Sequence, residues 1–266
     1  DVYKRQILTG LILFTSCQST REVQANYEVA QIEGTRICMD STWDAHPDEK
    51  AAALLKPYKE KIDKMMYEVI GVSEMTMDKG RPESLLSNLV AEVLRLSAER
   101  VLKHPADIGI MNMGGLRNIL PQGNITVDAV FEILPFENSL CVLTMKGTEI
   151  KRLMEVIASL HGEGLSGAHL EITKDGKLLK ATVQEKEIED DKDYTVATID
   201  YLADGNDGLT PFINADKREC PDGLTLRGLF LDYVRQQTAA GKKITSKLDG
   251  RITCLLYTSD AADDKA

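Results

Sequence analysis

Residues 107–117 read DIGIMNMGGLR, an apolar run followed directly by a polar residue and a pair of glycines. Ile108 and Ile110 predict a short buried strand, because a brief apolar run bounded by turn residues is typical of one. Gly114 and Gly115 then let the backbone approach a ligand closely, since neither carries a side chain. The segment therefore predicts a core strand that ends in a tight turn.

Two side chains with binding chemistry flank these glycines. Asn112 offers both a donor and an acceptor, which suits the edge of a base, and Arg117 offers a planar fork that suits phosphate or ribose oxygens. A strand that runs into two glycines is not specific on its own. A tight turn with a capping Asn and a surface Arg is an equally simple interpretation of this segment alone.

The regions on either side predict the fold class. Hydrophobic residues recur at helical spacing between Ser84 and Leu102, and the other segments switch between helical spacing and strand-like alternation. Interleaved strands, hairpins and helices indicate an α+β domain with mixed β-sheets and packed helices. The expected helices are 48–66, interrupted at Pro57, 84–102, 126–132, 147–160 and 225–239, and the expected strands are 27–33, 67–76, 107–112, 139–145, 169–171, 178–183, 194–199 and 251–253.

Two aromatic residues lie in predicted loops rather than at core positions. Phe136 belongs to the segment PFEN (135–138), and Tyr201 precedes the turn DGNDG (204–208). Their rings could plug loops against the core. If both line one cleft, they could instead sandwich a purine or pyrimidine, as aromatic side chains do in nucleic-acid sites.

Taken together, these segments resemble the C-terminal domain of 5'-nucleotidases. The family pattern is Asn-x-Gly-Gly-x-Arg, then Pro-Phe-x-Asn, then an aromatic residue six positions before the Asp of a Gly-Gly-Asp-Gly turn. This chain has the same order and spacing, and the similarity extends from about Asp48 to Arg251. The family often has Phe at the position of Tyr201 and Gly at the position of Asn206, where Asn tolerates a left-handed backbone.

The resemblance implies a role for each matching residue. Phe136 and Tyr201 would clamp the base, and Asn112 would meet its polar edge. Arg117 would face the ribose or phosphate, and Asp207 would accept hydrogen bonds from the ribose hydroxyls. Gly114 and Gly115 would form the pocket floor, and Arg81 is the nearest match, one position out of register, to a further family arginine.

In the family this domain follows a metallophosphatase domain that binds two metal ions through Asp, His and Asn. No such motif occurs here, and His46, His104, His161 and His169 lie in unrelated contexts. We therefore expect no metal, cofactor or catalytic residue in this chain, and no hydrolysis by the chain alone. The divalent metal pair would belong to a partner phosphatase chain.

Composition limits the possible partners. A formal charge of −10 and a pI near 5.0 exclude broad attraction to nucleic acid, which needs clustered Lys and Arg. The five cysteines form no CxxC pair and therefore predict no zinc site, and their odd number and wide separation predict no disulfide framework.

The amino end resembles an export signal. Lys4 and Arg5 precede the apolar run 7–14, which is followed by Thr15-Ser16-Cys17. The small residues before Cys17 resemble a bacterial lipobox, although a plain signal peptide remains an alternative. We expect a signal segment (1–17), a tether with a first strand (18–47), the binding domain (48–253) and a non-native tail (254–266), in an exported, periplasmic protein that is lipidated at Cys17.

Three functions fit this sequence. The first is a nucleoside- or nucleotide-recognition subunit that acts with a separate metallophosphatase chain in 5'-nucleotide hydrolysis. The second is a non-catalytic periplasmic lipoprotein that binds nucleosides or nucleotide 5'-monophosphates. The third is a structural lipoprotein that has lost its ligand, but the joint presence of the pocket residues argues against it.

Overall fold

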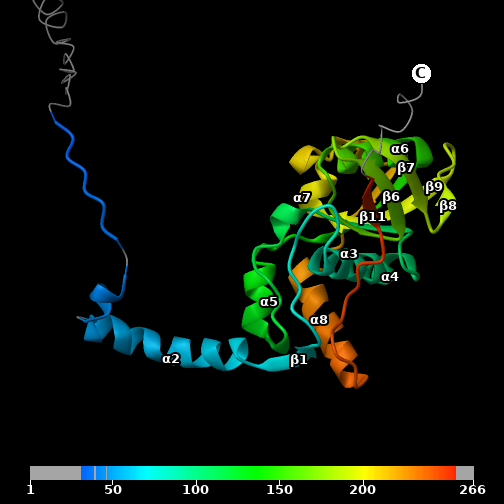
Figure 1. Ribbon diagram of the computed structural model, residues 1–266. Coiled ribbons are helices and arrows are strands. Elements are labelled where there is room, and N and C mark those ends of the chain that lie inside the picture. The colour runs from blue at the N-terminus through cyan, green and yellow to red at the C-terminus, as the bar shows by residue number, and fades with distance from the viewer. Residues whose placement is uncertain (1–30, 39, 46, 256–266) are drawn as a thin grey trace, which may run out of the picture. The chain divides into compact units, whose positions relative to one another are not determined.

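The computed structural model describes residues 31–38, 40–45 and 47–255 and divides into two units, one ending at Ala52 and one beginning at Ala53 (Figure 1). The described part of the first unit holds the 3-10 turn η1 (Ser41–Ala45) and the start of helix α2 (Glu49–Met66). The signal-like segment 1–17 lies outside the described residues. Residues 31–33 form no strand, and the rest of the strand expected over 27–33 lies outside the described residues too.

Helix α2 begins directly after Asp48, close to the start that the sequence predicted. The Asp48 carboxylate accepts hydrogen bonds from the backbone N–H groups of Lys50 (2.9 Å) and Ala51 (3.1 Å), which have no partner within the helix. The interruption expected at Pro57 was wrong, because the helix continues through it. Ala, Leu, Lys and Glu surround Pro57, and these strong helix formers offset the one hydrogen bond that proline cannot donate.

None of the residues of α2 is buried, yet the helix is amphipathic. Leu54, Tyr58, Ile62 and Met65 recur at helical spacing on one side, and each is more than half exposed. Leu55 extends this apolar stripe, while Lys and Glu side chains occupy the opposite side.

The second unit is built on a mixed five-stranded sheet. Strand β9 pairs in parallel with β2, and every other neighbouring pair is antiparallel. All four residues of β2 are buried, as the apolar run in the sequence predicted. In sheet order the strands are β10 (Lys217–Glu219), β4 (Leu140–Lys146), β9 (Asp193–Ile199), β2 (Ile108–Met111) and β5 (Gly164–Ser166).

A four-stranded sheet and a two-stranded ribbon complete the strands of this unit. In the four-stranded sheet, β11 (Ile252–Leu255) lies parallel to β6 (Ala168–Thr173), and the hairpin continues through β7 (Leu178–Val183) to β8 (Lys186–Glu187). The predicted strand at 251–253 is confirmed, and it runs two residues past the boundary we expected. The ribbon pairs β1 (Val69–Ser73) with β3 (Gly123–Thr126).

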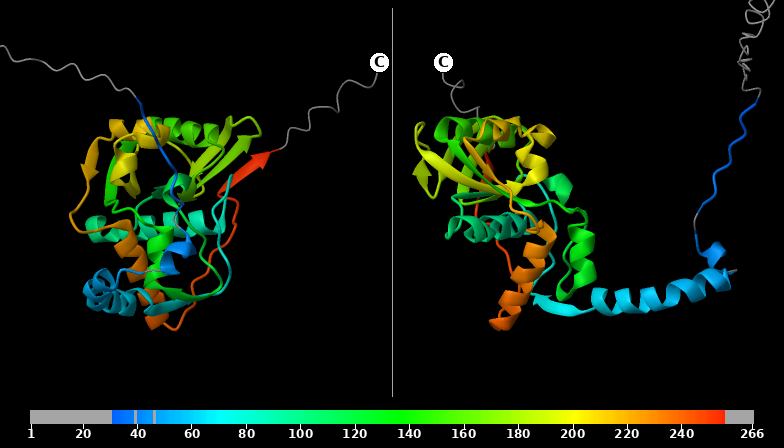
Figure 2. Two further views of the ribbon diagram at one scale, coloured as in Figure 1. Left: turned by 90° about the vertical axis from the view of Figure 1, so that its left-hand side faces the viewer. Right: turned by 180° about the vertical axis from the view of Figure 1, so that it is seen from behind.

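Helices cover the five-stranded sheet, as Figure 2 shows from two sides. Helix α3 packs on β2, β5 and β9 and on α8, because Leu86, Leu89, Val90, Val93 and Leu94 are all buried. Ser84, Thr126 and Thr225 cap the helices that follow them. The helices of this unit are α3 (Leu85–Ser97), α4 (Glu99–Leu102), α5 (Val127–Ile133), α6 (Gly147–Ser159), α7 (Asp200–Ala203) and α8 (Leu226–Ala239), with 3-10 turns η2 (Met113–Gly115), η3 (Asn206–Gly208) and η4 (Thr210–Asn214).

A disulfide joins Cys141 to Cys220, with 4.2 Å between their Cα atoms. The sequence predicted no disulfide framework, and that prediction was wrong. The two cysteines lie 79 positions apart, so their spacing carries no signal. They meet because β10 pairs with β4, which places Glu219 opposite Val142 and the next residues opposite each other.

Candidate functional site

Sheet topology brings three loops together at one end of the strands of the five-stranded sheet. The parallel strands β2 and β9 both stop at this end, at Met111 and Ile199. Strand β4 runs the other way and begins there, since Leu140 pairs with Ile199. The segments that follow β2, follow β9 and precede β4 are therefore neighbours in space, although up to 95 positions separate their residues.

These segments enclose a pocket of about 360 Å³, which we call the aromatic pocket. Its volume lies within the range of sites for small molecules. Seven of the eight residues predicted from the sequence line it, and Asn138 of the PFEN segment joins them. The lining residues are Asn112, Gly114, Gly115, Arg117, Phe136, Asn138, Tyr201 and Asp207.

The glycine turn closes one side of this pocket. A Cβ atom on Gly115 would lie 2.3 Å from the Met111 methyl carbon and 2.8 Å from Asn112 Oδ1, so no other residue fits without a shift. A Cβ atom on Gly114 would lie at ordinary contact distance, 3.6 Å from Asp207 Oδ2. Gly114 thus keeps the pocket open, and Gly115 allows the turn to pack.

The turn after β9 carries the carboxylate. Tyr201 Oη donates to Asp207 Oδ1 at 2.8 Å, and Asn112 Nδ2 donates to Asp207 Oδ2 at 2.5 Å. The bond to the Asp207 carboxylate raises the pKa of the Tyr201 hydroxyl. Asp207 itself has a left-handed backbone (φ 54°, ψ 25°), which the sequence had shown only to be tolerated at Asn206. The Asn206 side chain donates to the Tyr201 carbonyl oxygen at 2.7 Å instead.

Arg117 and Phe136 face each other on the other side of the pocket. The guanidinium carbon lies 6.0 Å from the centre of the Phe136 ring, and Arg117 Nη1 donates to the Gly114 carbonyl oxygen at 3.3 Å. Phe136 is 48% exposed and Tyr201 is 41% exposed, which is high for aromatic side chains. Both rings therefore keep open surface available for contact with a ligand.

Arg81 does not line the aromatic pocket. Its guanidinium donates to the Gly162 carbonyl oxygen at 2.7 Å and forms an ion pair with Glu163. The Glu163 carboxylate is only 3% exposed and also accepts the backbone N–H of Met113. Burial raises the pKa of Glu163, and the bonds from Met113 and Arg81 oppose that rise. Arg81 thus reaches the glycine turn through Glu163 rather than directly.

Lys79 supports the same turn from a second direction. Its ammonium group donates to the carbonyl oxygens of Met113 and Leu116. Sequence reasoning missed both Lys79 and Glu163, because each contacts the turn through backbone atoms and belongs to no motif. No signal in a single sequence would have found them.

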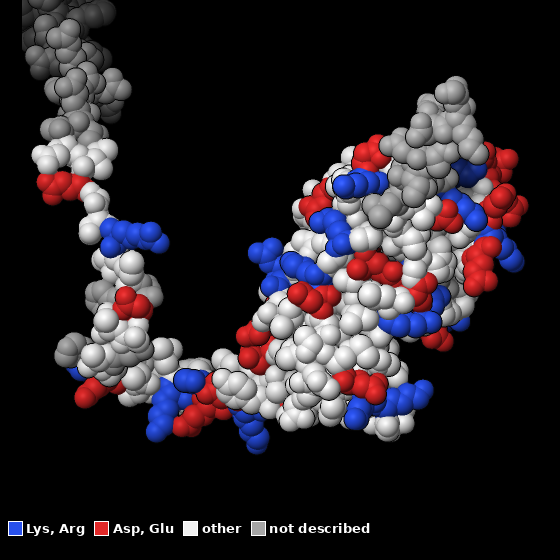
Figure 3. Space-filling view, in the orientation of Figure 1, with Lys and Arg blue, Asp and Glu red and all other residues white. Residues whose placement is uncertain are grey.

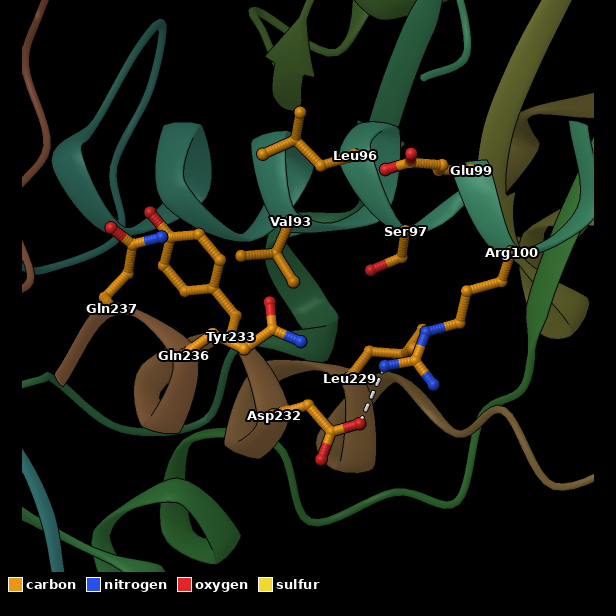
Figure 4. A pocket seen from close by; sticks show the side chains of 10 residues that line it. All are labelled: Val93, Leu96, Ser97, Glu99, Arg100, Leu229, Asp232, Tyr233, Gln236 and Gln237. Atoms are coloured by element: carbon orange, nitrogen blue, oxygen red, sulfur yellow. Dashed lines mark hydrogen bonds and ion pairs between the residues drawn. The ribbon is translucent and has the colours of Figure 1, made fainter. Parts of the chain in front are cut away.

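A second hollow, of about 440 Å³, lies between α3, α4 and α8 (Figure 4). Two of its three charged groups pair with each other, since Arg100 Nη2 lies 2.8 Å from Asp232 Oδ2 and Glu99 is the third. None of its lining residues belongs to a predicted binding motif. The aromatic pocket is therefore the better candidate, although it is the smaller of the two.

Other kinds of site find no support in the described residues. Within that part of the chain, no group of three His, Cys, Asp or Glu side chains is placed to hold a metal ion. No helix in it has the length and apolar character needed to cross a bilayer. On the face in Figure 3, basic and acidic side chains are interspersed without a broad field of one sign.

Fold and site together define an α+β domain whose pocket joins two half-exposed rings, an arginine and a carboxylate at the end of a mixed sheet. The chain belongs to the family described as 5'-nucleotidase, C-terminal domain, whose model matches residues 67–214. The match contains all the residues of the aromatic pocket.

Individual proteins of known name and one solved structure are also similar to this chain. The protein UshA of Yersinia enterocolitica is 30% identical over 189 residues, which cover 68% of this chain and 34% of UshA. The cell wall protein Lmo0130 of Listeria monocytogenes is 26% identical over 254 residues, 85% of this chain and 31% of its own length. The chain thus spans about a third of these relatives. The crystal structure of a 5'-nucleotidase precursor from Thermus thermophilus superposes with a TM-score of 0.65 at 27% identity, over 80% of this chain and 44% of that one.

Proposed function

We propose that this chain recognises the nucleoside part of a nucleotide for a 5'-nucleotidase. The observation that carries the proposal is the aromatic pocket, in which the segments before β4 and after β9 bring Phe136, Tyr201 and Asp207 together. Two partly exposed rings offer flat apolar faces to a base, and a carboxylate between the segments accepts hydrogen bonds from sugar hydroxyls. Arg117 supplies positive charge for a phosphate.

If the Tyr201 ring stacks on the base, its removal should weaken nucleoside binding. Replacing Tyr201 with Ala removes one aromatic face, which is worth roughly 1–3 kcal/mol per stacked base, so adenosine should bind at least about tenfold more weakly. Isothermal titration calorimetry with adenosine and AMP measures this. Tyr58→Ala is the matched control, because Tyr58 is an exposed tyrosine of α2 outside the pocket. Unchanged affinity in a folded Tyr201→Ala protein would refute the stacking role.

We propose further that a dimetal phosphatase, outside the described residues, performs the hydrolysis. Its activated water would attack phosphate while this domain holds the nucleoside. The relatives support this division, because two thirds of their length lies beyond the part that matches this chain. Adding the chain to a metallophosphatase should raise AMP hydrolysis above that of the phosphatase alone. No increase, together with tight nucleoside binding, would favour the non-catalytic lipoprotein instead.

We also propose that the chain is exported and lipidated at Cys17. The disulfide supports export, because such bonds persist in oxidising compartments, and one relative is named a cell wall protein. Cys17→Ala should abolish incorporation of labelled fatty acid and release the protein from the membrane fraction. Lipid label retained in that variant would exclude Cys17 as the anchor site.

A further inference from the structure

The Asp207 carboxylate is held by two protein donors, one on each oxygen. Tyr201 Oη binds Oδ1 and Asn112 Nδ2 binds Oδ2. A carboxylate has about four lone-pair positions, so roughly two remain for a ligand. Because both oxygens are engaged, the carboxylate cannot rotate freely about the Cβ–Cγ bond of Asp207.

Asn112 is fixed in this role by its surroundings. Its side chain is 4% exposed, and Oδ1 has no hydrogen-bond partner among the described residues. Turning the amide over would bring Oδ1 against the Asp207 carboxylate, and two acceptors repel each other. The amide nitrogen must therefore face Asp207. Asn112 holds the carboxylate from the buried side of the pocket.

Tyr201 holds the carboxylate from the open side. Its ring is 41% exposed, and its backbone carbonyl is fixed by the Asn206 amide at 2.7 Å. Gly205 (φ 81°) and Asp207 (φ 54°) turn the chain back, so that the hydroxyl reaches a residue six positions later. A phenylalanine would keep the same ring but could not donate this bond.

We propose that the Tyr201 hydroxyl is a positioning group, which together with Asn112 orients Asp207 to accept both hydroxyls of a ribose diol. This inference rests on the proposed function and adds to it the groups that hold Asp207 in place for the sugar. A cis-diol can donate one hydrogen bond to each carboxylate oxygen, and a carboxylate already held in place loses no further freedom when it binds. The pocket would thereby favour ribonucleosides over nucleosides without the diol.

The test compares two ligands with three proteins, which are the unaltered protein, Tyr201→Phe and Asp207→Asn. Tyr201→Phe keeps the ring and removes only the hydroxyl. By calorimetry, it should weaken adenosine binding by about three- to tenfold, the effect of one hydrogen bond, and leave 2',3'-dideoxyadenosine within about twofold. Asp207→Asn should reduce the preference for adenosine over the dideoxy compound, because Asn keeps only one of the two acceptor oxygens. Circular dichroism melting of each variant shows that it is folded.

Each other outcome overturns something specific. An equal loss for both ligands would mean that the hydroxyl supports the ring and not the carboxylate. Tighter adenosine binding by Tyr201→Phe would mean that the hydroxyl competes with the diol. Either result refutes the positioning role while the proposed nucleoside site stands. If the unaltered protein binds neither adenosine nor the dideoxy compound, the proposed function fails, and the inference fails with it.

Discussion

At the scale of single residues, Glu163 is a buried charge that contacts the glycine turn of the aromatic pocket through the Met113 N–H. Its raised pKa means that the folded protein binds a proton more tightly than the unfolded chain, whose ordinary value is 4.5. Below pH 4.5, the Glu163 carboxyl is protonated in both the folded and the unfolded state, and its contribution to stability is complete because no charge is buried. This contribution is lost as the pH rises through the raised pKa. Glu163→Gln keeps a neutral side chain, so the original protein should lose stability relative to this variant over that range.

Urea unfolding across a pH series measures this difference, and Glu92 provides a control of opposite sign. Burial raises the pKa of Glu92, but hydrogen bonds from Arg95 and Ser166 outweigh it and the pKa lies below 4.5. The original protein should therefore gain stability relative to Glu92→Gln as the pH rises toward 4.5. If the original protein instead gains stability relative to Glu163→Gln as the pH rises above 4.5, the ion pair with Arg81 outweighs the burial of Glu163.

The pocket residues could be predicted because their chemistry is local in the sequence. Asn112, Phe136 and Asp207 each lie in a short motif whose spacing is visible, and the structure brings them together. The sequence could not decide whether Asn206 or Asp207 takes the left-handed backbone, because both side chains tolerate it. Their hydrogen-bond partners decide between them, and those lie in tertiary structure.

At the scale of elements, the disulfide fastens the short edge strand β10 to β4. Cys141 is fully buried, and 79 positions separate the two cysteines, so the bond strongly restricts the unfolded chain. Replacing both with Ala should lower the free energy of unfolding by about 2–5 kcal/mol. Urea unfolding with and without reductant measures this loss. Cys254→Ala is the control, since Cys254 is exposed and outside the disulfide.

If the double replacement unfolds at the same urea concentration as the original protein, the bond adds nothing to stability.

The length of an element explains whether the sequence predicted it. Helices such as α3 and α6 are long enough for a periodic pattern to emerge. Strands β3, β5, β8 and β10 have two to four residues each, too few for alternation, and they exist only through their partners.

At the scale of the whole molecule, the binding domain should not need the residues before Asp63. The core begins at the end of α2, where Met66 packs against it, and none of the residues of α2 is buried. Deleting residues 1–62 should therefore leave adenosine affinity within about twofold, since no pocket contact is lost. Calorimetry and circular dichroism of the shortened chain check this. A larger loss of affinity, or an unfolded product, would contradict it.

The apolar stripe of α2 has a consequence for handling the protein. A helix with leucines, a tyrosine and an isoleucine exposed along one side, and charges along the other, is a surfactant. At an air–water interface the stripe leaves water and the helix lies flat. Dilute samples and thin films for electron microscopy should then lose protein to that interface, or hold it in one orientation. Surface tension should fall with the full chain and not with the chain that begins at Asp63.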